Sequence, residues 1–143
     1  MPAMTTGEAR ERFARARVAH LATIDEADRP HLVPVVFALT DDTVVFAVDH
    51  KPKRSPQLKR LTNIRAHPDV CLLVDDYDED WDLLWWARAD GTATVLPAAE
   101  TSAASARYVR LLREKYGQQY ADRPPAGPVV EIVVSRWSGW RAV

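Results

Sequence analysis

The strongest constraint on the fold is a set of three short strand candidates joined by tight turns near the N-terminus. They span residues 18–24, 31–39 and 43–48, and the third is dense in β-branched side chains. Turn chemistry separates them at residues 25–30 and again at Asp41-Asp42. Strands with such short connections pair in the antiparallel sense, because a parallel pair needs a long crossover. The sequence therefore predicts β-hairpins.

Pro34 lies in the middle of the second strand candidate. Proline has no N–H to donate to a strand ladder, so it is confined to edge strands, bulges or breaks in the pairing. We therefore expect an edge, a bulge or a broken ladder at this point.

Three helices and three further strands complete the predicted chain. Thr5 and Glu8 have the capping-box spacing for a first helix, and Ser55 followed by Pro56 has the character of a second helix start. The helices are expected over 4–17, 55–66 and 98–116, and the strands over 70–74, 83–96 with a bend at Asp90-Gly91, and 129–134. Six strands and three helices favour a mainly β fold, in which antiparallel hairpins close into a small barrel with helices outside.

Bulk properties narrow the class of protein. The 143 residues suit one domain, 1–143, and a chain that is 47% hydrophobic and 27% charged is typical of soluble globular proteins. No apolar stretch is long enough for a membrane span, and Cys71 is the single cysteine, which favours a reducing, cytoplasmic setting. With a net charge of −1, the whole chain is not a typical nucleic-acid-binding protein.

Positive charge is concentrated between Asp49 and Arg65, where there are six Lys or Arg residues and one acid. Lys51, Lys53 and Arg54 precede the helix start at Ser55, and Lys59 and Arg60 follow on the first turns. Free backbone N–H groups and the helix dipole make such a place favourable for an anion. The alternative is a solvated surface helix whose cations pair with the acidic residues that follow at 75–82. The pattern points to a phosphorylated or polycarboxylated ligand.

A cluster of acidic residues follows, and after it come the tryptophans. The acids are Asp75, Asp76, Asp78, Glu79, Asp80 and Asp82, and they favour a solvated loop outside the chemistry, without the spacing of a calcium-binding loop. Trp85, Trp86 and Trp140 could supply flat walls for a planar ring, although core or interface packing is the alternative for most of them. No histidine or cysteine spacing indicates a metal site, and no residue is identified as catalytic. Reactive chemistry is then expected from a bound cofactor.

Several short motifs, in their order and spacing, resemble one known family. They are Leu21-Ala22-Thr23-Ile24-Asp25, Arg29-Pro30-His31-Leu32-Val33-Pro34-Val35, Lys51-Pro52-Lys53, Asn63-Ile64, Pro68 to Asp75, Leu84 to Gly91, and the terminal Ser-Arg-Trp-Ser-Gly-Trp. The chain resembles the pyridoxamine 5′-phosphate oxidase-like superfamily over nearly its whole length. Within it, the chain is similar to the branch of probable coenzyme F420-dependent enzymes.

The resemblance implies a six-stranded antiparallel split β-barrel that forms a homodimer, with cofactor sites between the subunits. It implies that the cofactor phosphate is held at Lys51, Lys53 and Arg54, beside Ser55. It also implies that the ring lies against the second strand at Pro34, Val35 and Val36. Residues 81–88 and the terminal Trp-Ser-Gly-Trp, with Trp86 and Trp140 among them, are then expected to complete the cleft from either subunit.

The resemblance also bears on which cofactor is bound. FMN-binding oxidases of the superfamily usually carry an Arg and a Lys on the second strand, and the stretch His31 to Val36 has neither. Lys59, Arg60 and Arg65 offer cations for the polyglutamate tail of F420. These features favour F420 over FMN.

The leading hypothesis is therefore an F420-dependent reductase that passes a hydride to a small unsaturated or carbonyl substrate. The alternatives are an FMN-binding oxidase of the same fold and a non-enzymatic module that binds a cofactor, a tetrapyrrole or a nucleic acid. No nucleic-acid or membrane partner is expected under the leading hypothesis.

Overall fold

The computed structural model describes residues 3–49 and 57–143. The helices and short 3-10 turns, in chain order, are α1 Thr6–Arg15, α2 Gln57–Ala66, η1 Trp81–Leu83, η2 Ala99–Thr101 and α3 Ala103–Lys115. The strands are β1 Ala19–Ile24, β2 Pro30–Val35, β3 Ala38–Thr40, β4 Thr43–Ala47, β5 Asp69–Asp76, β6 Trp85–Leu96 and β7 Val129–Arg141.

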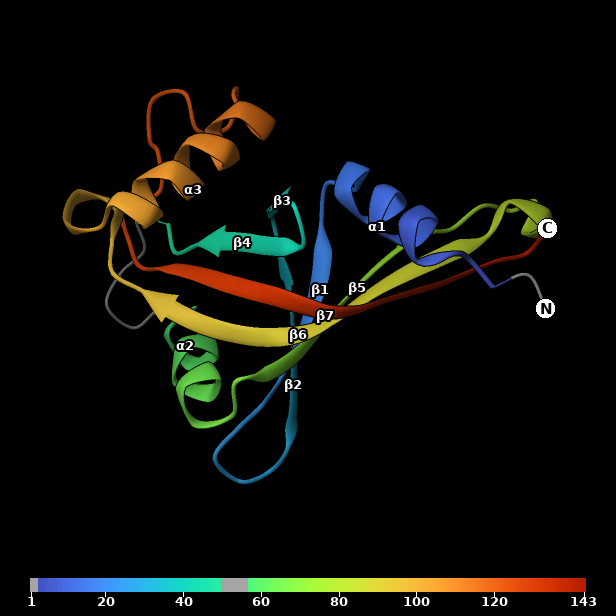
Figure 1. The fold of residues 1–143 in the computed structure, drawn as a ribbon, viewed down its shortest axis with the longest axis horizontal. Coiled ribbons are helices and arrows are strands. Elements are labelled where there is room, and N and C mark those ends of the chain that lie inside the picture. The colour runs from blue at the N-terminus through green and yellow to red at the C-terminus, as the bar shows by residue number, and fades with distance from the viewer. Residues whose placement is uncertain (1–2, 50–56) are drawn as a thin grey trace.

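All seven strands form one antiparallel sheet in the order β2-β1-β5-β6-β7-β4-β3. Figure 1 shows β6 and β7 as long neighbouring strands that run across the molecule, with α1 and α3 on one side and α2 below them. The predicted mainly β architecture with flanking helices is confirmed. Pro34 lies in β2, which is an edge strand, so the edge placement expected for this proline is also confirmed.

The sheet has seven strands instead of six because the predicted strand 31–39 is divided in two. β2 ends at Val35 and β3 begins at Ala38. Between them, Phe37 N–H donates to the Tyr116 hydroxyl oxygen at 3.1 Å. The single proton of that hydroxyl is shared between Arg17 O at 2.9 Å and Phe37 O at 3.0 Å. Because both backbone groups of Phe37 contact the side chain of Tyr116, the C-cap residue of α3, they do not take part in a strand ladder.

The first helix is two residues shorter at each end than predicted, although its expected cap is present. The Thr5 hydroxyl accepts a hydrogen bond from Glu8 N–H at 3.1 Å, and Ala16 is already extended. Phe13 of α1 is fully buried in the main core, with its ring 4.9 Å from Phe37 and 5.3 Å from Trp137. α1 therefore packs on the face of the sheet that carries the main core.

The third helix was predicted as one element over 98–116, and this is wrong at its N-terminal end. Ser102 has an extended backbone, with φ −144° and ψ 119°, and separates η2 from α3. Its hydroxyl accepts from Ser105 N–H at 3.2 Å, so Ser102 is the N-cap of α3. The last strand is longer than predicted, because β7 continues through Trp137 to Arg141.

At Asp90-Gly91, where a bend of the strand was predicted, the register between β6 and β7 shifts. Asp90 pairs with Arg136 and Gly91 with Val134, so Ser135 is the additional residue. Its hydroxyl donates to Asp90 O at 3.1 Å.

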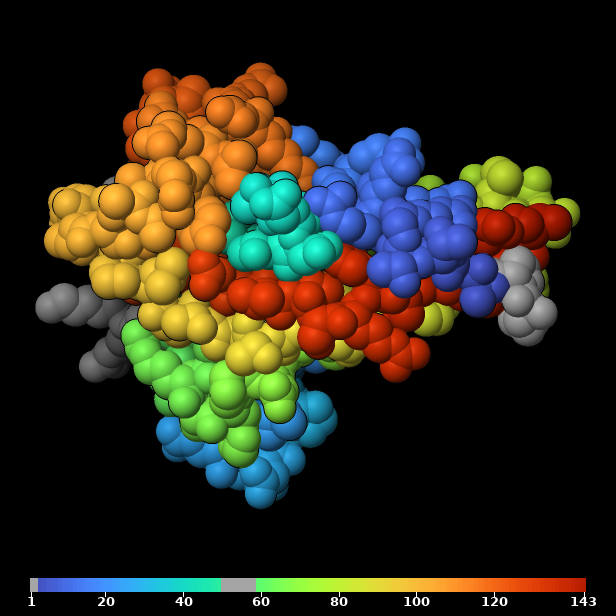
Figure 2. Space-filling view, viewed as in Figure 1, coloured from blue at the N-terminus to red at the C-terminus, as the bar shows by residue number. Residues whose placement is uncertain are grey.

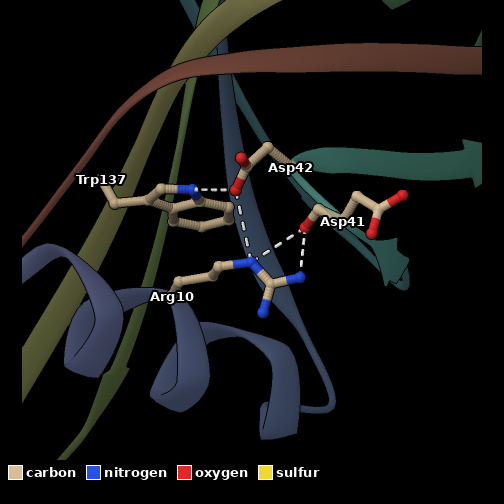
Figure 3. Close-up of polar contacts among 4 residues, drawn as sticks. All are labelled: Arg10, Asp41, Asp42 and Trp137. Carbon is tan, nitrogen blue, oxygen red and sulfur yellow. Dashed lines mark hydrogen bonds and ion pairs between the residues drawn. The ribbon is translucent and has the colours of Figure 1, made fainter.

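The turn between β3 and β4 is tied to both α1 and β7 (Figure 3). Arg10 Nε donates to Asp41 O at 2.9 Å, and Trp137 Nε1 donates to Asp42 Oδ1 at 3.0 Å. Asp41 has φ 51°, a left-handed conformation that Asp adopts more readily than most residues. In the space-filling view this turn fills the space between α1 and α3 (Figure 2).

Within the described residues, no helix is both long enough and apolar enough to span a membrane.

We expect Gly139→Ala to destabilise the fold by about 1–3 kcal/mol, the usual cost of overpacking a tight contact. α1 crosses β7 at this glycine, and a Cβ there would lie 2.7 Å from Met4 Sδ and 2.9 Å from Trp86 O. Gly7→Ala is the matched control, because nothing lies within 4 Å of its added Cβ and alanine favours a helix. Urea unfolding measures both, and an equal effect of the two changes would contradict the close approach.

We also expect Lys115 to make stability rise with pH. Burial, with a smaller contribution from Arg17, lowers the pKa of Lys115 to about 8, below its unfolded value of roughly 10.4. Between these values the unfolded state binds more protons than the folded state, so the free energy of unfolding increases with pH. Urea unfolding of the wild type and Lys115→Met, between about pH 7 and pH 9.5, should show the wild type gaining relative to the variant. A difference that does not change with pH would contradict this assignment.

Candidate functional site

The face of the sheet opposite α1 brings together residues from five strands. Residues that alternate with the core residues form one row across the sheet, consisting of Pro34, His20, Leu73, Arg88 and Ser138. Asp75, Trp86 and Trp140 form the next row. We call the surface made by these eight residues the outer face.

A cavity of about 380 Å³ opens on the outer face at β5, β6 and β7. This volume lies at the lower end of the range for small-molecule pockets. Trp86 and Trp140 pair across β6 and β7, and both line the cavity together with Leu73 and Tyr77. The arrangement offers aromatic and aliphatic surface to a planar molecule.

The charged groups of this cavity differ in how they are paired. Arg88 Nε lies 3.3 Å from Asp90 Oδ2, and the Arg88 guanidinium lies 5.7 Å from the centre of the Trp86 ring. Asp75 and Asp76 line the same cavity and are exposed. Among the described residues, neither of these two carboxylates forms an ion pair within 4.0 Å. The cavity therefore carries net negative charge.

The acidic residues 75–82 were expected to form one solvated loop, and the structure shows a different arrangement. Asp75 and Asp76 are the last residues of β5. Asp78 and Asp80 instead close a compact turn, in which Asp80 N–H donates to Asp78 Oδ1 at 2.7 Å and Asp82 N–H donates to Asp80 Oδ1 at 3.1 Å. The acidic residues thus divide between the cavity wall and the turn beyond it.

In the described part of the chain, two buried polar atoms on the outer face have no hydrogen-bond partner. They are Trp140 Nε1 and Ser138 Oγ, which belong to residues two apart on β7. A buried donor without a partner costs about 1–3 kcal/mol. A ligand that offers a hydrogen-bond acceptor to the indole N–H would remove that cost.

The predicted ring-contact residues do not share one face. Pro34 lies on the outer face and Val36 is 39% exposed, whereas the Val35 side chain is 5% exposed and packs in the main core. A contact between Val35 and a ligand on the outer face would therefore come from its backbone. Pro34 is separated from Arg88 by β1 and β5, so at strand spacings of about 4.8 Å it lies on the order of 15 Å from the Trp86 strand.

Lys59 and Arg60, the predicted cations for a cofactor tail, have different surroundings on α2. Lys59 Nζ lies 3.8 Å from Asp25 Oδ2, in a pair whose lysine side chain is 54% exposed. The lowered pKa of Asp25 comes chiefly from the Arg29 backbone hydrogen bond, and Lys59 adds less. Lys59 is thus loosely paired. Its partner is Asp25, and not one of the acidic residues 75–82.

Arg60 is half-buried, and its Nε atom has no hydrogen-bond partner among the residues that the structure describes. Burial lowers the pKa of Arg60, and the nearby Asp49 acts in the opposite direction. Asp49 also accepts a hydrogen bond from the Tyr120 hydroxyl at 3.2 Å. Arg60 therefore lies near a carboxylate of its own chain.

Lys51, Lys53, Arg54 and Ser55, the predicted phosphate anchors, lie outside the described residues. Cys71 lies on β5 with its thiol pKa raised, chiefly by burial, which does not favour a nucleophile. Within residues 3–49 and 57–143, no three His, Cys, Asp or Glu residues gather to hold a metal ion.

Sequence reasoning missed Leu73, Asp75, Asp76 and Tyr77 as cavity residues. The exposed alternate positions of β5 were the available signal, but the strand was expected to end at Val74. Trp86 and Trp140, which were predicted as cleft residues, do line the cavity, and so does Trp85.

Solved structures with the same fold come from several bacteria. A conserved hypothetical protein from Mycobacterium tuberculosis has a TM-score of 0.73 and 24% identity, over 97% of this chain and 86% of that chain. A FAD-binding protein from Mesorhizobium loti has a TM-score of 0.69 and 20% identity, over 96% and 93%. A protein described as an F420 reductase has a TM-score of 0.62 and 21% identity, over 87% and 90%. At these identities the likeness shows the fold alone.

The family follows from the sequence match. The family model for pyridoxamine 5′-phosphate oxidase matches residues 5–141, which is nearly the whole chain. The chain therefore belongs to the pyridoxamine 5′-phosphate oxidase-like family, and the predicted split-barrel fold is confirmed. A search of curated proteins gives no match.

Proposed function

We propose that this protein is a coenzyme F420-dependent oxidoreductase that reduces a small unsaturated or carbonyl compound. The observation that carries the proposal is the outer face, where Pro34 and the Trp86–Trp140 cavity share one surface of the sheet. That surface is wide enough for a planar cofactor ring and a second planar molecule next to it. The F420 reductase of similar fold adds support from a distant relative.

The residues present fit a flavin-like ring. Pro34 offers exposed apolar surface on the edge strand β2, and Val36 offers more just after that strand ends. Trp140 Nε1 and Ser138 Oγ are polar atoms in need of partners. The chemistry supplied by bound reduced F420 is hydride transfer to an electron-poor double bond or carbonyl. The protein's own contribution is to hold the two planar molecules in place and to donate a hydrogen bond from Trp140 to a carbonyl oxygen. No side chain is proposed as the proton donor, which leaves this role to solvent.

The charge distribution supports F420 as the cofactor. FMN-binding oxidases of the superfamily usually carry an Arg and a Lys on the second strand, and the stretch His31 to Val36 of this chain has neither. The phosphate is then assigned to Lys51, Lys53 and Arg54 beside Ser55, and the carboxylates of the tail to Lys59 and Arg60. The loose pairing of Lys59 leaves it able to exchange Asp25 for a ligand carboxylate.

A homodimer is part of the same proposal. Apolar side chains are exposed on β1, β2 and β5, including Leu32 at 65%, Ile24 at 41% and Leu73 at 37%. They lie on the same side of the sheet as Pro34. A second copy of the chain would cover this surface and enclose the cofactor ring between subunits.

An FMN- or FAD-binding protein of the same fold is the second candidate. The FAD-binding protein of Mesorhizobium loti favours it, since that protein has a comparable likeness to this chain. A non-enzymatic cofactor- or tetrapyrrole-binding module is a further alternative, and the lack of turnover with reduced F420 would favour it.

We expect purified protein to bind F420 more tightly than FMN or FAD, and Lys51→Ala and Lys53→Ala each to weaken F420 binding about tenfold or more. A hydrogen bond to a charged group is worth about 1.5–3 kcal/mol, which corresponds to such factors. Equilibrium dialysis measures the three affinities. Arg15→Ala is the charge-matched control, because Arg15 pairs with Glu11 on the exposed side of α1. Tight FMN or FAD binding without F420 binding, or unchanged affinity in both lysine variants, would contradict the assignment.

We expect Leu32→Lys to raise the dimer dissociation constant by about two orders of magnitude, since an unpaired buried charge costs about 3 kcal/mol. Analytical ultracentrifugation measures this. Val133→Lys is the control, because Val133 is 54% exposed on β7 beside β4, and β1, β5 and β6 lie between this strand and β2. A wild-type monomer, or a Leu32→Lys dimer as stable as the wild type, would show that the second copy does not dock here.

A further inference from the structure

The aromatic cavity and the basic segment differ in charge, and this difference bears on what each can bind. The basic segment, residues 49–65, suits an anion. The cavity instead has two carboxylates, Asp75 and Asp76, at its wall. Its one guanidinium, Arg88, is already paired with Asp90 at 3.3 Å. An anionic group in the cavity would face two like charges without a free cation to offset them.

The cavity also has a specific polar requirement. Trp140 Nε1 is buried and has no partner within residues 3–49 and 57–143, and an indole N–H can only donate a hydrogen bond. Trp86, the cross-strand neighbour of Trp140, lines the same cavity. A molecule that satisfies both features is planar and has an acceptor oxygen, such as a carbonyl, at one edge.

We infer that this cavity is the substrate subsite and that it selects neutral or positively charged planar carbonyl compounds over carboxylated analogues. Asp75 and Asp76 provide the selection against anions, Trp86 and Trp140 hold the ring, and the Trp140 N–H receives the carbonyl oxygen. The inference rests on the proposed function for the role of the ligand as hydride acceptor, whereas binding itself needs no cofactor. Carboxylated tetrapyrroles are then poor substrates, and neutral enones and quinones are better ones.

Isothermal titration calorimetry of the wild-type protein with coumarin and coumarin-3-carboxylate tests the selection. The two probes share a planar ring and a lactone carbonyl, and differ by one carboxylate. We expect coumarin to bind about tenfold more tightly, as like charges in close contact disfavour a wrong ligand. In Asp75→Asn/Asp76→Asn the ratio should fall to about one, while the coumarin affinity stays within about twofold.

Two further variants separate charge selection from general effects. Glu79→Gln/Asp82→Asn removes two exposed acids of the same segment that do not line the cavity, and should keep the wild-type ratio. Trp140→Phe keeps a ring but removes the N–H, and should weaken both probes by about the same factor, roughly five- to tenfold.

Equal binding of the two probes to the wild type, an unchanged ratio in Asp75→Asn/Asp76→Asn, or no binding of coumarin at all would overturn the inference. F420 affinity, measured separately, distinguishes this failure from that of the proposed function. Selective coumarin binding without F420 binding leaves the cavity assignment intact and removes the cofactor assignment. F420 binding without coumarin selectivity leaves the cofactor assignment intact and removes the cavity assignment.

Discussion

The pair of hydrogen bonds between the Tyr116 hydroxyl and the backbone of Phe37 determines how the sheet is arranged. The Tyr116 hydroxyl accepts from Phe37 N–H at 3.1 Å and shares its proton between Phe37 O at 3.0 Å and Arg17 O at 2.9 Å. These contacts hold Phe37 out of the strand ladder, so β2 ends before it and β3 begins after it on the opposite edge of the sheet. One continuous strand here would have kept the chain on a single edge. Because β2 remains beside β1, Pro34 lies on the same face as Leu73 and Arg88. The candidate site therefore depends on a contact made on the other side of the sheet.

The basic segment, residues 49–65, and the acidic residues 75–82 contribute in different ways to this site. The basic segment was expected to bind an anion, and we propose that it holds the phosphate of the cofactor. The acidic residues were expected to remain in solvent, yet Asp75 and Asp76 border the aromatic cavity. A protein that binds a polyanionic cofactor and a small carbonyl substrate benefits from keeping opposite potentials at the two places, since each then discourages the wrong occupant.

Local rules were sufficient for much of the fold. The Thr5 cap, the edge position of Pro34 and the irregularity at Asp90-Gly91 depend on residues close in sequence, and all three were predicted. The break at Phe37 was not, because its cause is a side chain 79 residues away. The tryptophans were recognisable as wall residues, but a cavity made by three paired strands requires their register. Hydrophobic periodicity indicates on which face of the sheet a residue lies, but it does not determine which residues are its neighbours on the adjacent strands.

The most direct test of the central claim is a crystal structure of the protein with F420 bound. The ring is expected on the outer face, within about 4 Å of Pro34 and Val36, with its phosphate at Lys51 and Lys53 and the Trp86–Trp140 cavity still free. A ring bound away from β2, for example in the polar groove between α3 and the β3–β4 turn, would contradict the claim.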